Sequence, residues 1–286
     1  MSRSSRLRAL RPAALLLLTA CGRREPARET TLRDLPQEQL RMTLKGYPGD
    51  WRDDAPMARG EPEPARTPAL PAGAEIIPLP PRSTPAAPSV TDAIANRRSL
   101  RAFSPAPLAL ADAGHLLWCA QGESGTLAGP DGLATPLRTA PSGGARYPLE
   151  LWLLARNVTG LAPGVYRYQP HGHALAAIHE SAEALPALLE ACYGDPTVGA
   201  PPAVLAWTAV PARTEWKYAY LAHRMIAMEA GHSAQNVYLG GAAVGVGACA
   251  VLGYNQTSLD ALLGVDGREE FALYVMPVGR PAGDTP

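Results

Sequence analysis

The chain has 286 residues, of which 47% are hydrophobic, so it is long enough and apolar enough to build one substantial core or two small ones. Its 26 basic side chains are balanced by 26 acidic ones. A net charge of zero, with no long run of Lys or Arg, gives no electrostatic basis for nucleic-acid binding, and we expect none.

The first 21 residues are typical of a bacterial export signal. Several Arg residues precede the apolar run 13–18, and the sequence Leu-Thr-Ala-Cys then ends at Cys21. A charged start, a short apolar segment and small residues before a cleavage point mark a secretory signal, and the apolar run is too short to span a bilayer. The last four residues also resemble a bacterial lipobox, which implies that Cys21 is lipidated; an ordinary signal peptide or a buried Cys is the alternative. We therefore expect a protein of the bacterial cell envelope, lipid-anchored or periplasmic, whose membrane contact is this anchor.

Residues 22–88 are predicted to be a Pro-rich spacer. They include the stretches PEPARTPALP and PLPPRSTPAAP. Proline removes hydrogen-bond donors and this composition offers little apolar surface to bury, so polyproline or irregular backbone is expected. Two stretches of this region, residues 40–51 and 76–79, carry more apolar residues than the rest and are expected to pack on the folded domain.

The folded domain is predicted over residues 89–286. Its helices are expected at 89–94, with Ser89 or Thr91 as N-cap, and at 108–121, 182–193 and 218–240. Its strands are expected at 149–155, 164–168, 174–179, 203–210, 248–253 and 271–278. Because helices and strands do not alternate regularly, the pattern favours an α+β fold over a doubly wound sheet.

Three segments that lie far apart in the sequence carry residue types suited to holding a ligand. RRSLRAF (97–103) offers forked Arg donors and a hydroxyl that match phosphate oxygens, although a solvated helix end would explain it too. PSGGARYP (141–148) leaves main chain bare for a flat ligand, or forms a tight turn. GGAAVGVGAC (240–249) allows close approach of backbone amides, or close helix packing; it is not a dinucleotide-binding fingerprint, because its glycines end a helix.

Together these segments resemble the nitroreductase superfamily of FMN enzymes, and specifically its SagB-type dehydrogenase, or thiazoline and oxazoline oxidase, branch. The resemblance runs from about residue 40 to 281 and includes Leu-Lys-Gly-Tyr-Pro before Trp51, RRSLRAF, PSGGARYPLEL, GLAPGVYRYQP, the segment TEWKYAYLAHRMIAMEAGHSAQNVYLGGAAVGVGA, and PVGRP. It implies FMN as cofactor and a nitroreductase-like α+β fold with a central, mainly antiparallel sheet and a long central helix. It also implies a homodimer with two flavins at its interface.

The resemblance assigns roles to particular positions. The FMN phosphate and ribityl end fall to Arg97, Arg98, Ser99 and Arg101, and Arg280 would close on the same phosphate. The isoalloxazine ring would rest on Pro141, Ser142, Gly143 and Gly144. The backbone N–H of Gly253, with Leu252 beside it, would face the flavin N5 region.

Lys217 and Tyr218 resemble the Lys-Tyr pair of the azoline-oxidising members, where the pair is linked to proton removal as hydride leaves the adjacent carbon. The alternative is a Tyr that packs at a helix start beside a solvated Lys. Glu229 and His232, three apart on one helical face, are expected to bond each other or the backbone.

The expected function is hydride transfer between a small-molecule or peptide-derived substrate and FMN N5, which Lys217 and Tyr218 favour. A nitro or quinone reductase of the same fold that uses NAD(P)H is the alternative, as is a non-catalytic surface lipoprotein that retains the fold. No metal is expected, because His171 and His173 lack further ligands and are interpreted as surface residues. The remaining cysteines, Cys119, Cys192 and Cys249, are expected to be buried free thiols, with one disulfide as the alternative.

Overall fold

The structure is a computed structural model that describes residues 51–67, 69–81, 88–128 and 134–283. The chain divides into two compact units, Met1–Lys45 and Gly46–Pro286, and all described residues belong to the second. The predicted signal, Cys21 and the spacer as far as residue 50 lie outside the described residues. Among the helices that are described, none combines the length and the apolar character needed to cross a bilayer.

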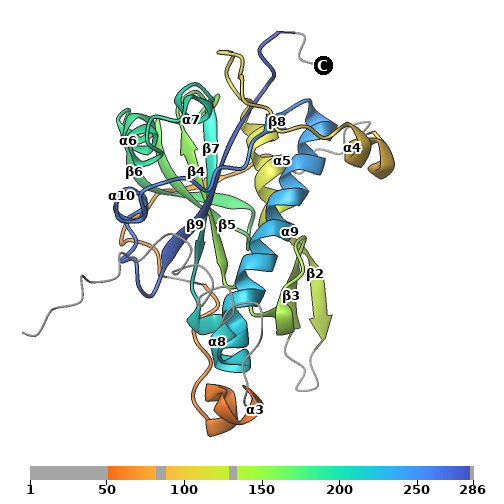
Figure 1. Ribbon diagram of the computed structural model, residues 1–286, viewed down its shortest axis with the longest axis vertical. Helices are drawn as coiled ribbons and strands as arrows, with labels where there is room; N and C mark the ends of the chain where they lie inside the picture. Colours follow the sequence, from red (N-terminus) through yellow and green to blue (C-terminus); the bar gives the residue numbers. More distant parts are fainter. Residues whose placement is uncertain (1–50, 68, 82–87, 129–133, 284–286) are drawn as a thin grey trace, which may run out of the picture. The chain divides into compact units, whose positions relative to one another are not determined.

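A seven-stranded antiparallel sheet forms the centre of the second unit (Figure 1). The strand order is β1-β6-β5-β4-β7-β9-β8, with β1 Ile76–Pro78, β4 Leu149–Ala155, β5 Gly164–Gln169, β6 Ala174–Glu180, β7 Ala203–Ala209, β8 Gly247–Ala248 and β9 Phe271–Gly279. Every residue of β4 and β7 is buried. Because both faces of these strands are covered, their sequences are mostly apolar without alternation, and Glu150 and Thr208 are the polar exceptions.

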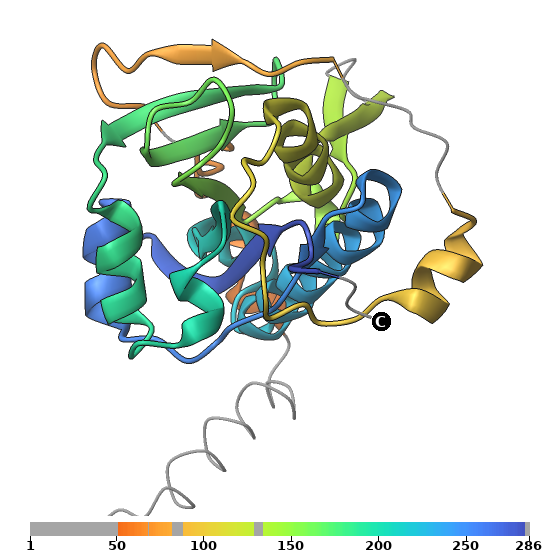
Figure 2. The same cartoon turned by 90° about the horizontal axis from the view of Figure 1, so that it is seen from above.

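Helices cover both faces of the sheet (Figures 1 and 2). On one face lie α5 (Leu110–Gln121) and α9 (Leu221–Val244), and on the other lie α6 (Ala184–Ala191), α7 (Pro196–Gly199) and α10 (Gln256–Leu263). Side chains alternate along β4, so that Leu151 and Leu153 join the core under α5 and α9, whereas Trp152 and Leu154 join the core under α6 and α10. The predicted α+β class with a mainly antiparallel sheet is confirmed.

The predicted single helix over 218–240 is wrong at its start. The structure has two helices, α8 (Ala212–Tyr218) and α9, and Ala219 lies between them with a φ of 46°. A left-handed residue cannot continue a right-handed helix, so the chain turns here. Helix α9 then runs beyond the predicted end to Val244, where Gly245 caps it with a φ of 67°.

One predicted strand is shorter in the structure than expected, and one hairpin was not predicted. The predicted strand 248–253 reduces to β8 and an isolated bridge between Val251 and Val275. The hairpin β2 (Glu123–Ala128) and β3 (Ala134–Arg138) was not predicted. Most of its described residues are exposed or half-buried, so the hairpin gives no alternating apolar signal. At α4 (Val90–Asn96) the expected cap is confirmed, since Ser89 Oγ accepts the Asp92 N–H at 3.1 Å.

Described residues upstream of residue 89 also contribute to the fold. Strand β1 pairs with β6 and is therefore part of the sheet. Further upstream, α3 (Trp51–Asp54) and the 3-10 helix η1 (Pro56–Arg59) contact α8. The side chain of Ala55 is only 1% exposed. Helices α3 and η1 were not predicted, because the proline-rich sequence around them gives no clear helical pattern.

Candidate functional site

A cleft of about 540 Å³ opens at the C-terminal end of α9. This volume is in the range typical of small-molecule sites. Its walls are formed by residues 96–102, by three residues from the last turns of α9, by residues 245–248 and by Pro281. Four of the five residues predicted to hold the phosphate end of FMN line this cleft: Arg97, Arg98, Ser99 and Arg101.

The segment RRSLRAF reaches the cleft because it docks on β8. After α4 ends, the Leu100 N–H donates to the Ala248 carbonyl at 2.9 Å. Leu100 is buried against Gly247, where a Cβ would overlap the Leu100 side chain. Glycine at 247 is therefore required for this approach, which holds the Arg side chains at the cleft.

The cationic side chains of the cleft have no acidic partner within the described part of the chain. Among the described residues, no carboxylate pairs with Arg97, Arg98 or Arg101. The Arg97 guanidinium lies 5.2 Å from the ring centroid of Tyr238, and Ser99 Oγ lies 3.4 Å from the Tyr238 hydroxyl. Guanidinium forks and a hydroxyl that face a cleft without an internal counter-ion are suited to a phosphate ligand.

Arg280 lies at the same end of α9 but is already engaged. Its Nη1 donates to the Val244 carbonyl at 3.1 Å, and its Nη2 pairs with Asp112 Oδ2 at 2.9 Å. A guanidinium that satisfies the last carbonyls of a helix also complements the helix dipole. The cleft wall here is Pro281, so Arg280 stands behind the cleft rather than in it.

Tyr238 is a cleft residue that the sequence interpretation missed. Its hydroxyl accepts the Ala250 N–H at 2.8 Å, which ties α9 to the segment after β8. Helical spacing places Tyr238, Gly241, Ala242 and Gly245 on one face, and all four line the cleft. This spacing was the available signal.

The predicted ring-side segment, residues 141–144, packs elsewhere, against α8 and the first half of α9. Gly143 N–H donates to Glu229 Oε1 at 2.9 Å. A Cβ on Gly144 would lie 2.7 Å from Tyr218 Oη and 3.0 Å from Lys217 Cδ. The structure therefore brings the Ser-Gly-Gly segment together with the Lys-Tyr pair. Pro141, just before them, is exposed.

These two groups of residues do not meet within one chain. Glu229 and Gly241 are twelve residues apart on α9, which corresponds to about 18 Å at the helical rise. Leu252 and Gly253 join neither group: both are exposed, Leu252 by 68%, in the segment between β8 and α10. Neither lines the cleft.

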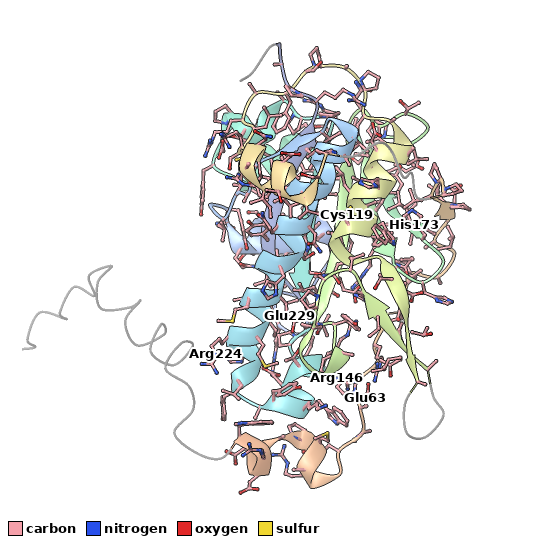
Figure 3. All side chains as sticks on the ribbon, turned by 90° about the vertical axis from the view of Figure 1, so that its right-hand side faces the viewer. Glu63, Cys119, Arg146, His173, Arg224 and Glu229 are labelled. Carbon is pink, nitrogen blue, oxygen red and sulfur yellow. The ribbon has the colours of Figure 1, made fainter. Side chains whose placement is uncertain are left out.

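Glu229 is a buried carboxyl, and its pKa depends on this packing (Figure 3). Burial raises the pKa of Glu229, while hydrogen bonds from the Gly143 N–H and the Ser142 hydroxyl oppose the shift. The expectation that Glu229 bonds the backbone is confirmed at Gly143. His232 is exposed, and no bond joins it to Glu229 in the described part of the chain.

The loop that follows Ser142 is held in an unusual backbone conformation. Gly144, Ala145 and Tyr147 have φ values of 61°, 52° and 49°, in the left-handed region. Non-glycine residues there are strained and persist where the surroundings fix them. Here the Tyr147 N–H donates to Ser142 Oγ at 2.9 Å, and its hydroxyl accepts the Arg138 N–H at 3.0 Å.

The remaining candidate residues have structural roles. His171 is exposed as expected, but the interpretation of His173 as a surface residue is wrong, because it is half-buried with its Nδ1 2.8 Å from the Tyr168 hydroxyl. Burial lowers the pKa of His173. The three described cysteines are free and buried, as expected: Cys119, Cys192 and Cys249.

A sequence profile described as the nitroreductase family matches residues 94–280, well over half of the chain. The chain belongs to the nitroreductase family. A nitroreductase-family protein of Methanocaldococcus jannaschii is 33% identical over 189 residues, which cover 66% of this chain and 89% of that protein. The expectation of an FMN-dependent oxidoreductase is thereby confirmed at the level of the family.

Solved structures agree with the family assignment. A nitroreductase-family protein from Ralstonia eutropha JMP134 is similar with a TM-score of 0.60 and 26% identity, over 78% of this chain and 98% of that one. A chain in the Escherichia coli microcin synthetase complex with truncated pro-MccB17 bound has a TM-score of 0.54 and 22% identity, over 87% of this chain and 92% of that one. This last similarity shows the shared fold alone.

Proposed function

We propose that this nitroreductase-family chain is a SagB-type dehydrogenase, which transfers a hydride between FMN N5 and a small-molecule or peptide-derived substrate. The observation that carries this proposal is the packing of Lys217 and Tyr218 against Gly144. It joins the pair that the sequence resemblance links to proton removal and the loop that the resemblance places along the flavin ring.

The cleft at the end of α9 fits the cofactor that the family uses. Among the described residues its Arg side chains have no carboxylate partner, and Gly245 and Gly247 contribute only main chain to its walls. Arg97, Ser99 and Arg101 would hold the phosphate, with Arg98 at the rim. When bound, FMN supplies a two-electron acceptor for hydride, and the protein's task is to place and orient it.

In this proposal Tyr218 handles the proton that accompanies substrate oxidation. As hydride leaves a substrate carbon, the proton on the adjacent atom passes to the Tyr218 oxygen, and the electron pair of that bond forms the new double bond. Lys217 Nζ lies 5.8 Å from the Tyr218 ring centroid, which places a cation beside the ring whose oxygen takes the proton.

We further propose that two copies of the chain assemble around α9. The phosphate cleft and the ring-side loop lie at different positions along this helix, so a second copy would bring its own loop to the ring of a flavin held in the first. Exposed apolar side chains on or beside α9, Met228 at 54% and Tyr220 at 56%, are consistent with a covered face. Light scattering on the purified protein tests this, and a monomer with bound FMN would contradict it.

The cofactor assignment is tested by the double variant Arg97→Ala/Arg101→Ala. Two charge-assisted contacts worth about 1.5–3 kcal/mol each would be lost, which predicts at least a hundredfold weaker FMN binding by fluorescence titration. Arg268→Ala is a matched control, because this side chain is 89% exposed on a loop outside the cleft. Unchanged affinity in the double variant contradicts the cleft assignment, and a wild-type protein that ignores FMN points to the non-catalytic alternative.

A nicotinamide-dependent nitro or quinone reductase is the second candidate, favoured by the 33% identical relative that carries the nitroreductase name. Stopped-flow mixing of the FMN-loaded protein with NADH and NADPH separates the two candidates. Rapid bleaching of the flavin by either nucleotide supports the reductase. Slow bleaching, with flavin reduction by a thiazoline or oxazoline substrate, supports the dehydrogenase.

We also propose that the protein is anchored in the bacterial cell envelope through a lipid on Cys21, on the basis of the lipobox-like sequence. Cell fractionation with labelled palmitate should place the label in the membrane fraction. Cys21→Ser is expected to abolish the label, and label that persists in this variant would contradict the proposal.

A further inference from the structure

Residues 51–66, which we call the strap, lie outside the stretch 94–280 that the family profile matches. We propose that the strap is part of the active site, and that Trp51 and Glu63 are positioning residues for Tyr218 and for the loop at Gly144. The proposal rests on the proposed function in one respect, since it takes Tyr218 and this loop to be the reactive region. The strap contacts this region at two places, through Trp51 and through Glu63.

The first contact fixes the Tyr218 ring. The indole of Trp51 lies against the phenol of Tyr218, with ring centroids 5.4 Å apart and planes inclined by 37°. The other end of the phenol points to the loop, because Tyr218 Oη lies 2.7 Å from where a Cβ of Gly144 would be. Packing on the ring face restricts the side-chain torsions that aim the hydroxyl. Trp51 thereby holds the Tyr218 oxygen toward the loop.

The second contact fixes the loop. Arg146 Nε donates to the Gly144 carbonyl at 3.2 Å, and Arg146 Nη1 pairs with Glu63 Oε1 of the strap at 2.9 Å (Figure 3). The Arg146 side chain is only 7% exposed, and burial lowers its pKa. A buried guanidinium needs such a partner. Although its own burial acts in the opposite direction, Arg66 and Arg146 lower the pKa of Glu63, so the carboxylate stays charged.

Main-chain bonds anchor the strap between these two contacts. Trp216 Nε1 donates to the Glu61 carbonyl at 2.8 Å, and Arg213 Nε donates to the Ala65 carbonyl at 3.0 Å. Both donors come from α8, the helix that ends at Tyr218. Because the acceptors are backbone carbonyls, these anchors do not depend on strap side chains. Trp51 and Glu63 can therefore be replaced without removing the bonds that hold the strap.

The first experiment measures order in the loop of the full-length, FMN-loaded protein by hydrogen exchange at residues 143–147. In Trp51→Ala and Glu63→Ala we expect exchange to rise by about tenfold, while Trp51→Phe restores most of the protection because an aromatic ring is kept. Glu61→Ala is the matched control. Its carboxylate pairs with Arg59 at the surface, and its carbonyl remains as the Trp216 acceptor.

The second experiment measures chemistry with a defined probe. The protein is reduced with dithionite and reoxidised by 1,4-benzoquinone between pH 6 and 9. We expect Trp51→Ala and Glu63→Ala to slow reoxidation by about tenfold or more, since small displacements of a reacting group have effects of this size. Trp51→Phe and Glu61→Ala should stay within about twofold of the wild type. All four variants should remain yellow, because Arg97 and Arg101 are untouched.

The outcomes separate this proposal from the proposed function. A yellow wild type, with Trp51→Ala and Glu63→Ala matching it in exchange and in reoxidation, overturns the role of the strap alone. A wild type that binds no FMN overturns the proposed function instead. Should Trp51→Ala fail to fold, Glu63→Ala against Glu61→Ala decides the question, since both remove a half-exposed carboxylate from the same segment.

Discussion

Replacing Glu229 tests how the ring-side loop is held to α9. Glu229→Ala removes the carboxylate that accepts the Gly143 N–H at 2.9 Å and leaves that part-buried donor without this partner. The loss of a charged hydrogen bond, with an unsatisfied donor left behind, costs about 2 kcal/mol. For a folded unit of this size, the melting temperature should fall by about 4–8 °C. Glu229→Gln keeps an acceptor oxygen and should cost less than about 1 kcal/mol.

The pH dependence of the same variants tests the electrostatic argument. Burial raises the pKa of Glu229 above its ordinary value of 4.5, so the folded state binds this proton more tightly than the unfolded state does. The contribution of the protonated carboxyl to stability is complete below pH 4.5 and is lost as the pH rises through the folded-state pKa. Glu229→Gln has no such proton. Its stability relative to the wild type should therefore improve from pH 4.5 to pH 8.

Urea unfolding of wild type, Glu229→Gln and Glu229→Ala, followed by circular dichroism at several pH values, gives these differences directly. Glu61→Gln serves as the control, because that carboxylate is half-exposed, pairs with Arg59 at the surface and does not contact the loop. The reasoning is refuted if Glu229→Ala is as stable as the wild type at pH 7. A difference between Gln and wild type that is constant across the pH range would refute the raised pKa.

Three further substitutions probe the fold and the cleft. Gly241→Ala should lose about 2 kcal/mol in urea unfolding, because a Cβ there would overlap the Val246 carbonyl oxygen; wild-type stability would contradict the close approach. Tyr238→Phe should lose about 1 kcal/mol and bind FMN more weakly in a fluorescence titration; full affinity would exclude this hydroxyl from the site. Arg213→Met should cost about 3–5 kcal/mol, because it removes a 2.5 Å partner from the buried Glu150 carboxylate; a neutral result would show that the remaining contacts of Glu150 suffice.

Much of the fold could be predicted from the sequence, at the elements where burial requires a recognisable pattern of apolar residues. Strand β4 was predicted at its observed bounds, because covering both faces of a strand favours a run in which nearly every residue is apolar. The break at Ala219 carries no such signal. Alanine favours helices, and tertiary packing alone imposes its left-handed backbone.

The candidate site was predictable in its parts and not in their arrangement. The residues 97–101 do line one cleft with the glycine-rich end of α9. Sequence order does not reveal that Gly143 packs against the first half of α9, away from the cleft at the end of this helix. The position of Gly143 depends on the length of α9 and on the side of the sheet from which the loop arrives. The strap was hidden for another reason: the two bonds that anchor it to α8 are accepted by main-chain carbonyls, which every sequence possesses.

The edges of the central sheet bear on how the chain avoids self-association. One edge is β1, three residues ending in Pro78, and the other is β8, two residues long. Such short borders, one of them ended by a proline, offer few free amides to a neighbouring sheet. Starting the polypeptide at residue 89 would strip β1 away and uncover the seven-residue β6. Such a shortened protein would expose a longer unpaired strand edge and would be prone to aggregate. The segment that contains β1 therefore also protects the sheet against edge-to-edge association.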